Sequence, residues 1–415
     1  MQDGRRGDEP ASCILYPASY ITRRAYFILH PASRILHPAS CLSMIPHPPS
    51  WFPVSDSAEI ASPALLVYPD RVEENLRRMI AIAGGVERLR PHMKTHKMPE
   101  MIRLQLARGI TRFKCATIAE AEMTASCGAP DVLLAYQPVG PNVGRFAQLA
   151  RQFPGTAFAT IADDADAIRA LSRASDNAGR PIDLLLDIDC GQHRCGVEAG
   201  ARALELYRLI ASSPGLKPGG LHVYDGHIHE ADPGERARHC DAAFAPVQDL
   251  RRQLTASGLP VPRVVAGGTP TFPLHARRPE VECSPGTCVF WDAGYASKLP
   301  DLDFLVAAVV LTRVISKPGG GRLCLDLGHK AIAAENAPPR VQFPELPDAK
   351  AVSHSEEHLV VETARAGELK VGDCCYGIPW HICPTVALYS EAVVIRDGRA
   401  RSPWKISARE RRLTL

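Results

Sequence analysis

The chain has 415 residues, with 48 lysines and arginines against 45 aspartates and glutamates. Hydrophobic residues make up 46% and charged residues 22%, an ordinary globular composition that excludes disorder throughout. The near-neutral charge offers no basic face, so nucleic acid is not an expected partner. The longest apolar stretch, 302–315, is interrupted by Asp303 and Arg313 and is shorter than the ~18 residues that suggest a spanning helix, so no membrane partner is expected.

The 13 cysteines are odd in number and scattered through apolar segments, unlike those of a disulfide scaffold. This usage predicts a reduced protein with a cytoplasmic location. The chain also lacks a charged start followed by an apolar stretch and a small-residue cleavage site, so no secretory signal is expected.

Residues 14–41 repeat with a period of seven, as ILYPASY, ITRRAYF, ILHPASR and ILHPASC. A period of seven is typical of a coiled coil, but three of the four units contain proline, which does not fit helix interiors. We therefore interpret residues 1–55 as a disordered or spurious extension that resembles a translated tandem DNA repeat. Met44 is then a candidate for the true start.

From residue 62 onward, short apolar runs alternate with helix-length segments. Eight strands are predicted, at 90–94, 113–118, 131–137, 156–161, 182–189, 220–226, 263–268 and 281–286. Helices are predicted at 73–83, 119–126, 163–178, 199–212 and 233–257. This alternation predicts an α/β fold with a TIM-like (β/α)8 barrel, whose active site lies at the carboxyl ends of the strands.

From about residue 302 the helical pattern stops. Short alternating runs follow at 304–315, 322–327, 359–363 and 392–396. The predicted organisation is a barrel over 56–300 and a smaller β domain over 301–415. The early strand at 64–68 is a candidate for joining the β domain.

The segment RPHMKTHK places five basic side chains at the end of the first predicted strand: Arg90, His92, Lys94, His96 and Lys97. Because side chains alternate along a strand, Lys94 shares a face with Arg90 and His92 and points into the barrel mouth. Crowding by Arg90, His96 and Lys97 is expected to lower the pKa of the Lys94 amine, as Schiff-base chemistry at neutral pH requires. A solvated basic turn is the alternative.

Two glycine turns follow the last two predicted strands. The first, AGGTPT, contains Gly267, Gly268 and Thr269, and the second, SPGT, contains Gly286 and Thr287. Backbone N–H groups of such loops can cradle a phosphate, and phosphate sites in barrels often use the loops after strands seven and eight. Ordinary tight turns are the alternative for each loop alone.

Two other strand ends are polar. DIDCGQHRCG contains Arg194, and YDGHIH contains Tyr224, His227 and His229. The histidine spacing also suits a hydrogen-bonded core network.

The carboxyl-terminal part carries a possible metal pair in the segment PWHICP. His381 and Cys383 are two positions apart and lie on one side if the segment is extended. Imidazole and thiolate suit zinc, and two protein ligands leave positions open for substrate and water. A buried cysteine beside a hydrogen-bonded histidine is the alternative.

In order, RPHMKTHK, GQHRCGV, GGTPT, SPGT, HSEEH and WHICPT resemble the D-threonine aldolase and D-serine dehydratase family, metal-assisted relatives of alanine racemase among pyridoxal-phosphate enzymes. The resemblance implies that Lys94 holds the cofactor, Arg194 lies near its phenolic oxygen and Tyr224 lies at its pyridine side. It implies that the two glycine loops bind the phosphate and that His381 and Cys383 bind the metal. It also implies a homodimer in which both chains form each active site.

The resemblance further implies a choice of reaction. Alanine racemases would carry arginine at Ser284, so serine there and tyrosine at 224 disfavour a racemase. Cys383 favours the dehydratase branch, because aldolase members tend to carry aspartate at that position. We expect metal-assisted elimination from D-serine or a D-3-hydroxy amino acid, giving a 2-oxo acid and ammonia. Zinc is the expected metal, with manganese or magnesium as alternatives.

Two other functions remain open at this stage. One is retro-aldol cleavage of D-threonine type to glycine and an aldehyde, with His227 or His229 as the base. The other is a non-catalytic protein that carries pyridoxal phosphate, which would require Lys94 and the phosphate loops but neither the β domain nor the metal pair.

Overall fold

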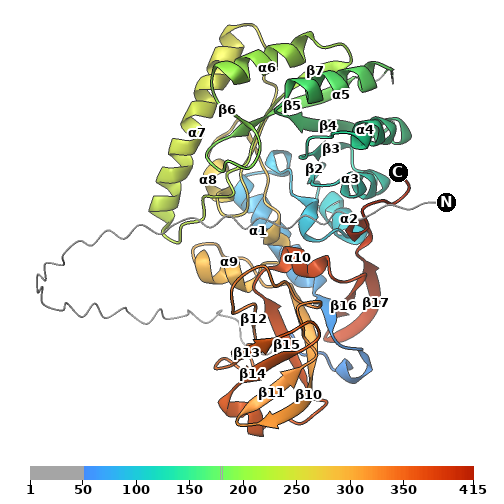
Figure 1. The fold of residues 1–415 in the computed structure, drawn as a ribbon, viewed down its shortest axis with the longest axis vertical. Helices are drawn as coiled ribbons and strands as arrows, with labels where there is room; N and C mark the ends of the chain where they lie inside the picture. The colour runs from blue at the N-terminus through green and yellow to red at the C-terminus, as the bar shows by residue number, and fades with distance from the viewer. Residues whose placement is uncertain (1–50, 178, 180) are drawn as a thin grey trace, which may run out of the picture. The chain divides into compact units, whose positions relative to one another are not determined.

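The computed structural model describes residues 51–177, 179 and 181–415, which are organised around two β-sheets (Figure 1). The seven-residue repeat lies outside the described residues, so its interpretation stays a prediction. None of the helices in the described ranges combines the length and apolar character that a membrane span needs.

The first sheet is parallel and forms the barrel. Its strands pair in the order β2 (Arg112–Cys115), β3 (Asp131–Leu134), β4 (Ala157–Ala162), β5 (Ile182–Asp189), β7 (Leu216–Val223), β8 (Val264–Ala266) and β9 (Val281–Cys283), with the short β6 (Val197–Glu198) beside β5. Single bridges from Leu89 to Cys283 and from His92 to Lys114 connect both edges to the segment before β2. These bridges close the sheet, so the barrel prediction is confirmed.

The prediction of a first strand at 90–94 is wrong for the second half of that range. The chain is extended up to His92, but Met93–Thr95 form a 3-10 turn. The physical reason is local, because the His92 imidazole accepts a hydrogen bond from the backbone N–H of Lys94 (3.3 Å) and so starts the turn. Lys94 therefore belongs to a turn rather than to a strand.

Helices cover the outside of the barrel (Figure 1). They are α1 (Pro69–Ala83), α2 (Pro99–Ala107), α3 (Ile118–Ser126), α4 (Pro141–Gln152), α5 (Ala165–Asn177), α6 (Ala201–Ser212), α7 (Pro233–Ala256) and α8 (Phe272–His275). Several begin where the sequence supplies a cap: Thr117 accepts a hydrogen bond from Glu120 N–H in α3, and Asp232 accepts one from Glu235 N–H in α7.

The second sheet contains β1 (Ala64–Val67), β10 (Ala308–Gly319), β11 (Arg322–Leu325), β12 (Val341–Gln342), β13 (Lys350–His354), β14 (Leu359–Glu362), β15 (Cys374–Pro379), β16 (Glu391–Arg396) and β17 (Arg399–Lys405). The early strand β1 lies antiparallel to β10 and parallel to β16, within this sheet. Two short helices, α9 (Ala293–Lys298) and α10 (Ile382–Val386), accompany it. The expectation that helices stop beyond residue 301 is wrong at α10, and the domain boundaries stay predictions.

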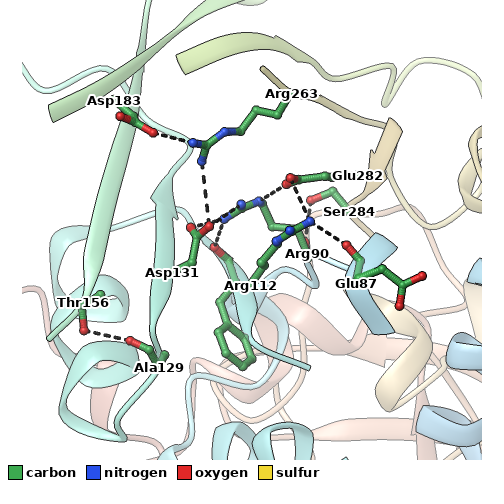
Figure 2. Close-up of polar contacts among 11 residues, drawn as sticks. Glu87, Arg90, Arg112, Ala129, Asp131, Thr156, Asp183, Arg263, Glu282 and Ser284 are labelled. Atoms are coloured by element: carbon green, nitrogen blue, oxygen red, sulfur yellow. Dashed lines mark hydrogen bonds and ion pairs between the residues drawn. The ribbon is translucent and has the colours of Figure 1, made fainter. Parts of the chain in front are cut away.

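The amino-terminal end of the barrel is closed by ion pairs centred on Arg90 (Figure 2). The Arg90 side chain is fully buried, and it donates to both carboxylate oxygens of Asp131 (2.7 and 3.0 Å) and to Glu282 (2.7 Å). Arg263 joins Asp131 to Asp183, and Arg112 donates to Glu282 (3.1 Å). Arg90 thus faces inward, as alternation predicts, but its charge is neutralised at the end of the barrel opposite to the mouth.

A small apolar cluster separates this network from the mouth. It consists of Leu133, Ala159, Ile161, Leu185 and Val265, which come from β3, β4, β5 and β8 and are buried. The barrel interior is therefore layered, with ion pairs at one end, aliphatic side chains in the middle and a polar cavity at the other end.

Candidate active site

A cavity of about 560 Å³ opens at the carboxyl ends of the barrel strands. Its polar lining residues are His92, Lys94, Lys114, Gln137, Asp163, Asp187, Arg194, His222 and Tyr224. Tyr136 and Val139 also line it and are more than half exposed, at 58% and 52%. The structure therefore brings three residues expected at the cofactor, Lys94, Arg194 and Tyr224, into one cavity.

The cations expected to crowd Lys94 have other partners. Arg90 lies in the network at the opposite end of the barrel, and Lys97 pairs with the buried Glu120. His96 is fully buried and accepts a hydrogen bond from the backbone N–H of Met98 (3.1 Å). The expected neighbourhood is therefore wrong, and the cations that share the cavity with Lys94 are Lys114 and Arg194.

The two glycine loops meet at the hydroxyl of Thr269. Its Oγ1 accepts hydrogen bonds from the backbone N–H groups of Gly286 (3.3 Å) and Thr287 (3.1 Å). Two N–H groups of the second loop therefore point towards one oxygen of the first loop, and such neighbouring N–H groups are typical of anion-binding turns.

Three glycines of this cradle leave little room for a side chain, and Gly267 leaves the least. A Cβ on Gly268 would lie 3.2 Å from the Tyr224 ring, and one on Gly286 would lie 3.0 Å from Thr95 Oγ1. At Gly267 the backbone has φ of +81°, and a Cβ would lie 2.7 Å from the His275 ring. The cradle is thus packed tightly against the residues around it, and it fits a phosphate held by backbone groups.

Asp225 supports the first loop, and the sequence analysis missed it. This buried carboxylate follows Tyr224 and accepts hydrogen bonds from Thr271 Oγ1 and His275 Nε2, both at 2.8 Å. Thr271 Oγ1 in turn accepts the backbone N–H of Gly268 (3.3 Å). The available signal was a carboxylate at the end of an apolar strand.

Asp225, Cys240 and His275 also place one ligand atom each within 4.8 Å of one another, which could hold a metal. The guanidinium of Arg278 argues against this, because it donates to His275 Nδ1 (2.9 Å). A histidine bound to metal through Nε2 carries its proton on Nδ1 and needs an acceptor there. We therefore interpret the cluster as a hydrogen-bond network.

The prediction that His381 and Cys383 lie on one side assumes an extended segment, but a helix begins at Ile382. His381 is the cap residue before α10, and Cys383 lies in the first turn of the helix. The two side chains nevertheless hydrogen-bond to each other, and His381 Nδ1 lies 2.6 Å from a carboxylate oxygen of Glu335. This carboxylate can orient the imidazole in the way typical of a metal ligand.

Cys383 connects the second sheet to the barrel mouth. Its Sγ lies 3.3 Å from the hydroxyl of Thr95, the neighbour of Lys94, and 3.5 Å from the hydroxyl of Thr287. Burial raises the pKa of the Cys383 thiol, but the hydrogen bond from His381 and the charge of Lys94 outweigh it, so the pKa is lowered. A lowered pKa favours the thiolate, the form that binds metal.

The two histidines considered as bases occupy different places. His229 lines a second cavity of about 200 Å³ together with Tyr295, Lys298 and His381. His227 instead packs against Gly191, whose Cβ would lie 3.1 Å from the imidazole Nε2. The structure thus brings His229 into a cavity with His381 of the metal pair.

Comparison with known proteins agrees with this geometry. Residues 67–293 match the family model described as alanine racemase, N-terminal domain, and residues 307–395 match the one described as putative serine dehydratase domain. The chain belongs to the alanine racemase-like family of pyridoxal-phosphate enzymes. Membership in this family confirms the resemblance inferred from the ordered motifs. Its similar relatives are aldolases and dehydratases, so the protein is a pyridoxal-phosphate-dependent lyase.

Three members illustrate the similarity. The chain is 34% identical over 371 residues to a D-threonine aldolase of an Arthrobacter species, covering 87% of this chain and 96% of that protein. The solved structure of D-threonine aldolase from Filomicrobium marinum has a TM-score of 0.80 at 30% identity, covering 87% and 99% of the two chains. A solved D-threo-3-hydroxyaspartate dehydratase in which cysteine is replaced by alanine, described as metal-free, has a TM-score of 0.74 at 25% identity and coverage of 84% and 98%.

Proposed function

We propose that this alanine racemase-like protein is a metal-assisted lyase that eliminates water from D-serine or another D-3-hydroxy amino acid. One observation carries the proposal: Cys383 touches both Thr95, beside Lys94, and Thr287 of the phosphate cradle. The metal pair and the cofactor residues therefore belong to one site, as a reaction needs when it breaks bonds at two adjacent carbons.

The residues of the barrel mouth fit pyridoxal phosphate. Lys94 offers the amine for its aldehyde, the paired glycine loops offer N–H groups for its phosphate, and the Arg194 guanidinium lies 4.9 Å from the centre of the Tyr224 ring. When bound, the cofactor supplies an electron sink for the α-carbon. The Nζ atom of Lys94 is then the group that takes the α-proton.

His381 and Cys383 fit a zinc ion better than manganese or magnesium, because imidazole and thiolate are softer ligands than carboxylates. The metal supplies Lewis-acid polarisation of the β-hydroxyl. Solved variants of a similar dehydratase replace one histidine or one cysteine by alanine, and the cysteine variant is described as metal-free; we propose that Cys383 is the counterpart of that cysteine. Loss of the α-proton and the β-hydroxyl gives an enamine, which hydrolyses to a 2-oxo acid and ammonia.

Retro-aldol cleavage is the second candidate. It is favoured by the similarity to D-threonine aldolase and by the position of His229, which shares a cavity with His381 and can take the β-hydroxyl proton. Incubation of the loaded enzyme with D-serine and D-threonine separates the two reactions. Pyruvate and ammonia from D-serine support elimination, whereas glycine and acetaldehyde from D-threonine support cleavage. Turnover of neither would point to a carrier of the cofactor.

We further propose a homodimer and a cytoplasmic location. The exposed Tyr136 and Val139 lie at the mouth of the cavity, where a second chain would cover them. Light scattering in solution tests the dimer, which should have twice the 45.0 kDa mass of the chain. Cell fractionation tests the location.

A further inference from the structure

A second lysine, Lys114, occupies the cavity of Lys94, and the proposed reaction leaves it without a role. Lys114 lies on β2 opposite Leu133 of β3, which belongs to the inward-facing aliphatic cluster, so Lys114 also faces inward. Its side chain is buried, the residue being 2% exposed, and it lines the cavity. Within the described ranges its ammonium makes no hydrogen bond or ion pair, although buried charges are normally paired.

Lys114 and Arg194 approach the same ring. The Lys114 Nζ lies 5.6 Å from the centroid of Tyr224, and the guanidinium carbon of Arg194 lies 4.9 Å from it. Two cations therefore converge at one side of the cavity. This arrangement suits an anionic ligand atom placed between them.

The neighbouring His222 supplies a hydrogen-bond acceptor beside these two cationic donors. This buried histidine has Nδ1 at 2.6 Å from the Asp187 carboxylate, which leaves Nε2 as the atom that faces away. Burial lowers the pKa of His222 in spite of Asp187, so the ring is neutral and Nε2 is an acceptor. In the described structure this atom has no hydrogen-bond partner, and the residue lines the cavity.

We propose that Lys114 is a cofactor-binding residue, which together with Arg194 holds the phenolic oxygen of pyridoxal phosphate. The inference rests on the proposed function for the identity of the cofactor. The phenolate is the anionic group of the pyridine ring, and a buried unpartnered ammonium beside a guanidinium gains a charge-assisted hydrogen bond from it. His222 offers an acceptor for a hydroxyl or water at the same edge.

The charged and titratable groups around Lys114 come from three sides. They are His92 and Lys94 from the segment before β2, Asp187 and Arg194 from β5 and the loop after it, and His222, Tyr224 and Asp225 from β7 and the loop after it. Burial, and next the charge of Lys94, lower the pKa of Lys114 to about 7.

The test compares Lys114→Met, Lys114→Gln and Lys114→Arg with Lys217→Met, a control at an exposed lysine near the start of β7. Two quantities are measured: the Kd of the apoprotein for pyridoxal phosphate, and the pH at which the absorption of the bound cofactor changes. We expect Lys114→Met to weaken binding about tenfold, the worth of one charge-assisted hydrogen bond. The absorption midpoint should rise by about one pH unit, because a cation near Lys94 is lost.

The other variants separate charge from hydrogen bonding. Lys114→Gln should shift the midpoint as Lys114→Met does but lose less affinity, whereas Lys114→Arg should keep the midpoint near that of the wild type. Lys217→Met should behave as wild type. The inference is overturned if Lys114→Met, folded by circular dichroism, keeps both wild-type quantities, or if borohydride reduction attaches the cofactor to Lys114. Wild-type protein that binds no pyridoxal phosphate would instead overturn the proposed function.

Discussion

At the residue scale, Lys94 combines two properties that its neighbours in the basic segment lack. Its side chain lines the cavity, and the next residue, Thr95, touches both Gly286 of the phosphate cradle and Cys383. Lys97 faces a different environment, because its amine is held by the buried carboxylate of Glu120.

Lys94→Ala should therefore lose the visible absorption of bound cofactor and the activity together. Lys97→Ala should keep the absorption but melt at a lower temperature, because it leaves the Glu120 carboxylate buried and unpaired. Absorption spectra and thermal melting of the two variants check this. Attachment of the cofactor to Lys97 after borohydride reduction would contradict it.

Cys383 is the residue that distinguishes the two candidate reactions. Cys383→Asp keeps a ligand but hardens the site towards manganese or magnesium, so we expect it to lose D-serine elimination and to retain or gain D-threonine cleavage. Chelation of the wild type should likewise stop pyruvate release from D-serine. Product analysis and metal content provide the readout, with Cys324→Ser as a control in β11. Undiminished pyruvate release after chelation would show that the hydroxyl leaves without the metal.

Single residues with reactive chemistry could be predicted from the sequence because short ordered motifs carry them. Lys94, the paired glycine loops and the His381/Cys383 pair are of this kind. Lys114 and Asp225 were missed, because each is a charged residue beside apolar strand residues, and only the folded barrel shows which groups face them.

At the element scale, the supports of the phosphate loop can be tested separately from the loop itself. Asp225→Asn removes the charge that holds Thr271 and His275, and the amide can no longer accept equally well from both. We expect the Kd for pyridoxal phosphate to rise about tenfold, while secondary structure stays intact. Titration of the apoprotein measures this, and Asp249→Asn on the exposed face of α7 is the matched control. Unchanged affinity would mean that the loop holds its shape without the network.

Two elements differ from the sequence-based expectation for the same reason, which is a side chain acting as a cap. The His92 imidazole turns the first predicted strand into a 3-10 turn at Lys94. The helix α10 begins where Asp292, 90 positions earlier in the chain, accepts the backbone N–H of Ile382 (3.0 Å). Periodicity identified most long helices and most strands, although α2 and α4 are not among the predicted helices, and a five-residue helix capped from another part of the fold leaves no periodic signal.

At the scale of the whole molecule, the polar groups at the two ends of the barrel differ in whether they are paired. At the amino-terminal end, the guanidinium of Arg90 forms ion pairs with Asp131 and Glu282. At the opposite end the Lys114 ammonium and the Nε2 atom of His222 face the cavity without a hydrogen-bond partner in the described structure. The paired groups at the first end stabilise the fold, and the unpaired groups at the second end are available to bind a ligand.

Arg90→Met should consequently lower the free energy of unfolding by about 3–5 kcal/mol, because it leaves two carboxylates at the barrel end without their shared partner. Urea denaturation measures the change. Arg103→Met, which breaks an exposed ion pair with Glu100 (3.5 Å), should cost less than about 1 kcal/mol. Equal costs for the two variants would show that the barrel closure does not depend on Arg90.

The position of β1 also bears on how the protein is made. This strand leaves the ribosome early, yet its two neighbours are β10 and β16, which are synthesised after the entire barrel. At ordinary translation speeds β1 waits roughly tens of seconds with both edges unpaired. Its apolar residues are exposed to other chains during that time. We therefore expect a chaperone to bind this strand of the nascent protein until translation ends.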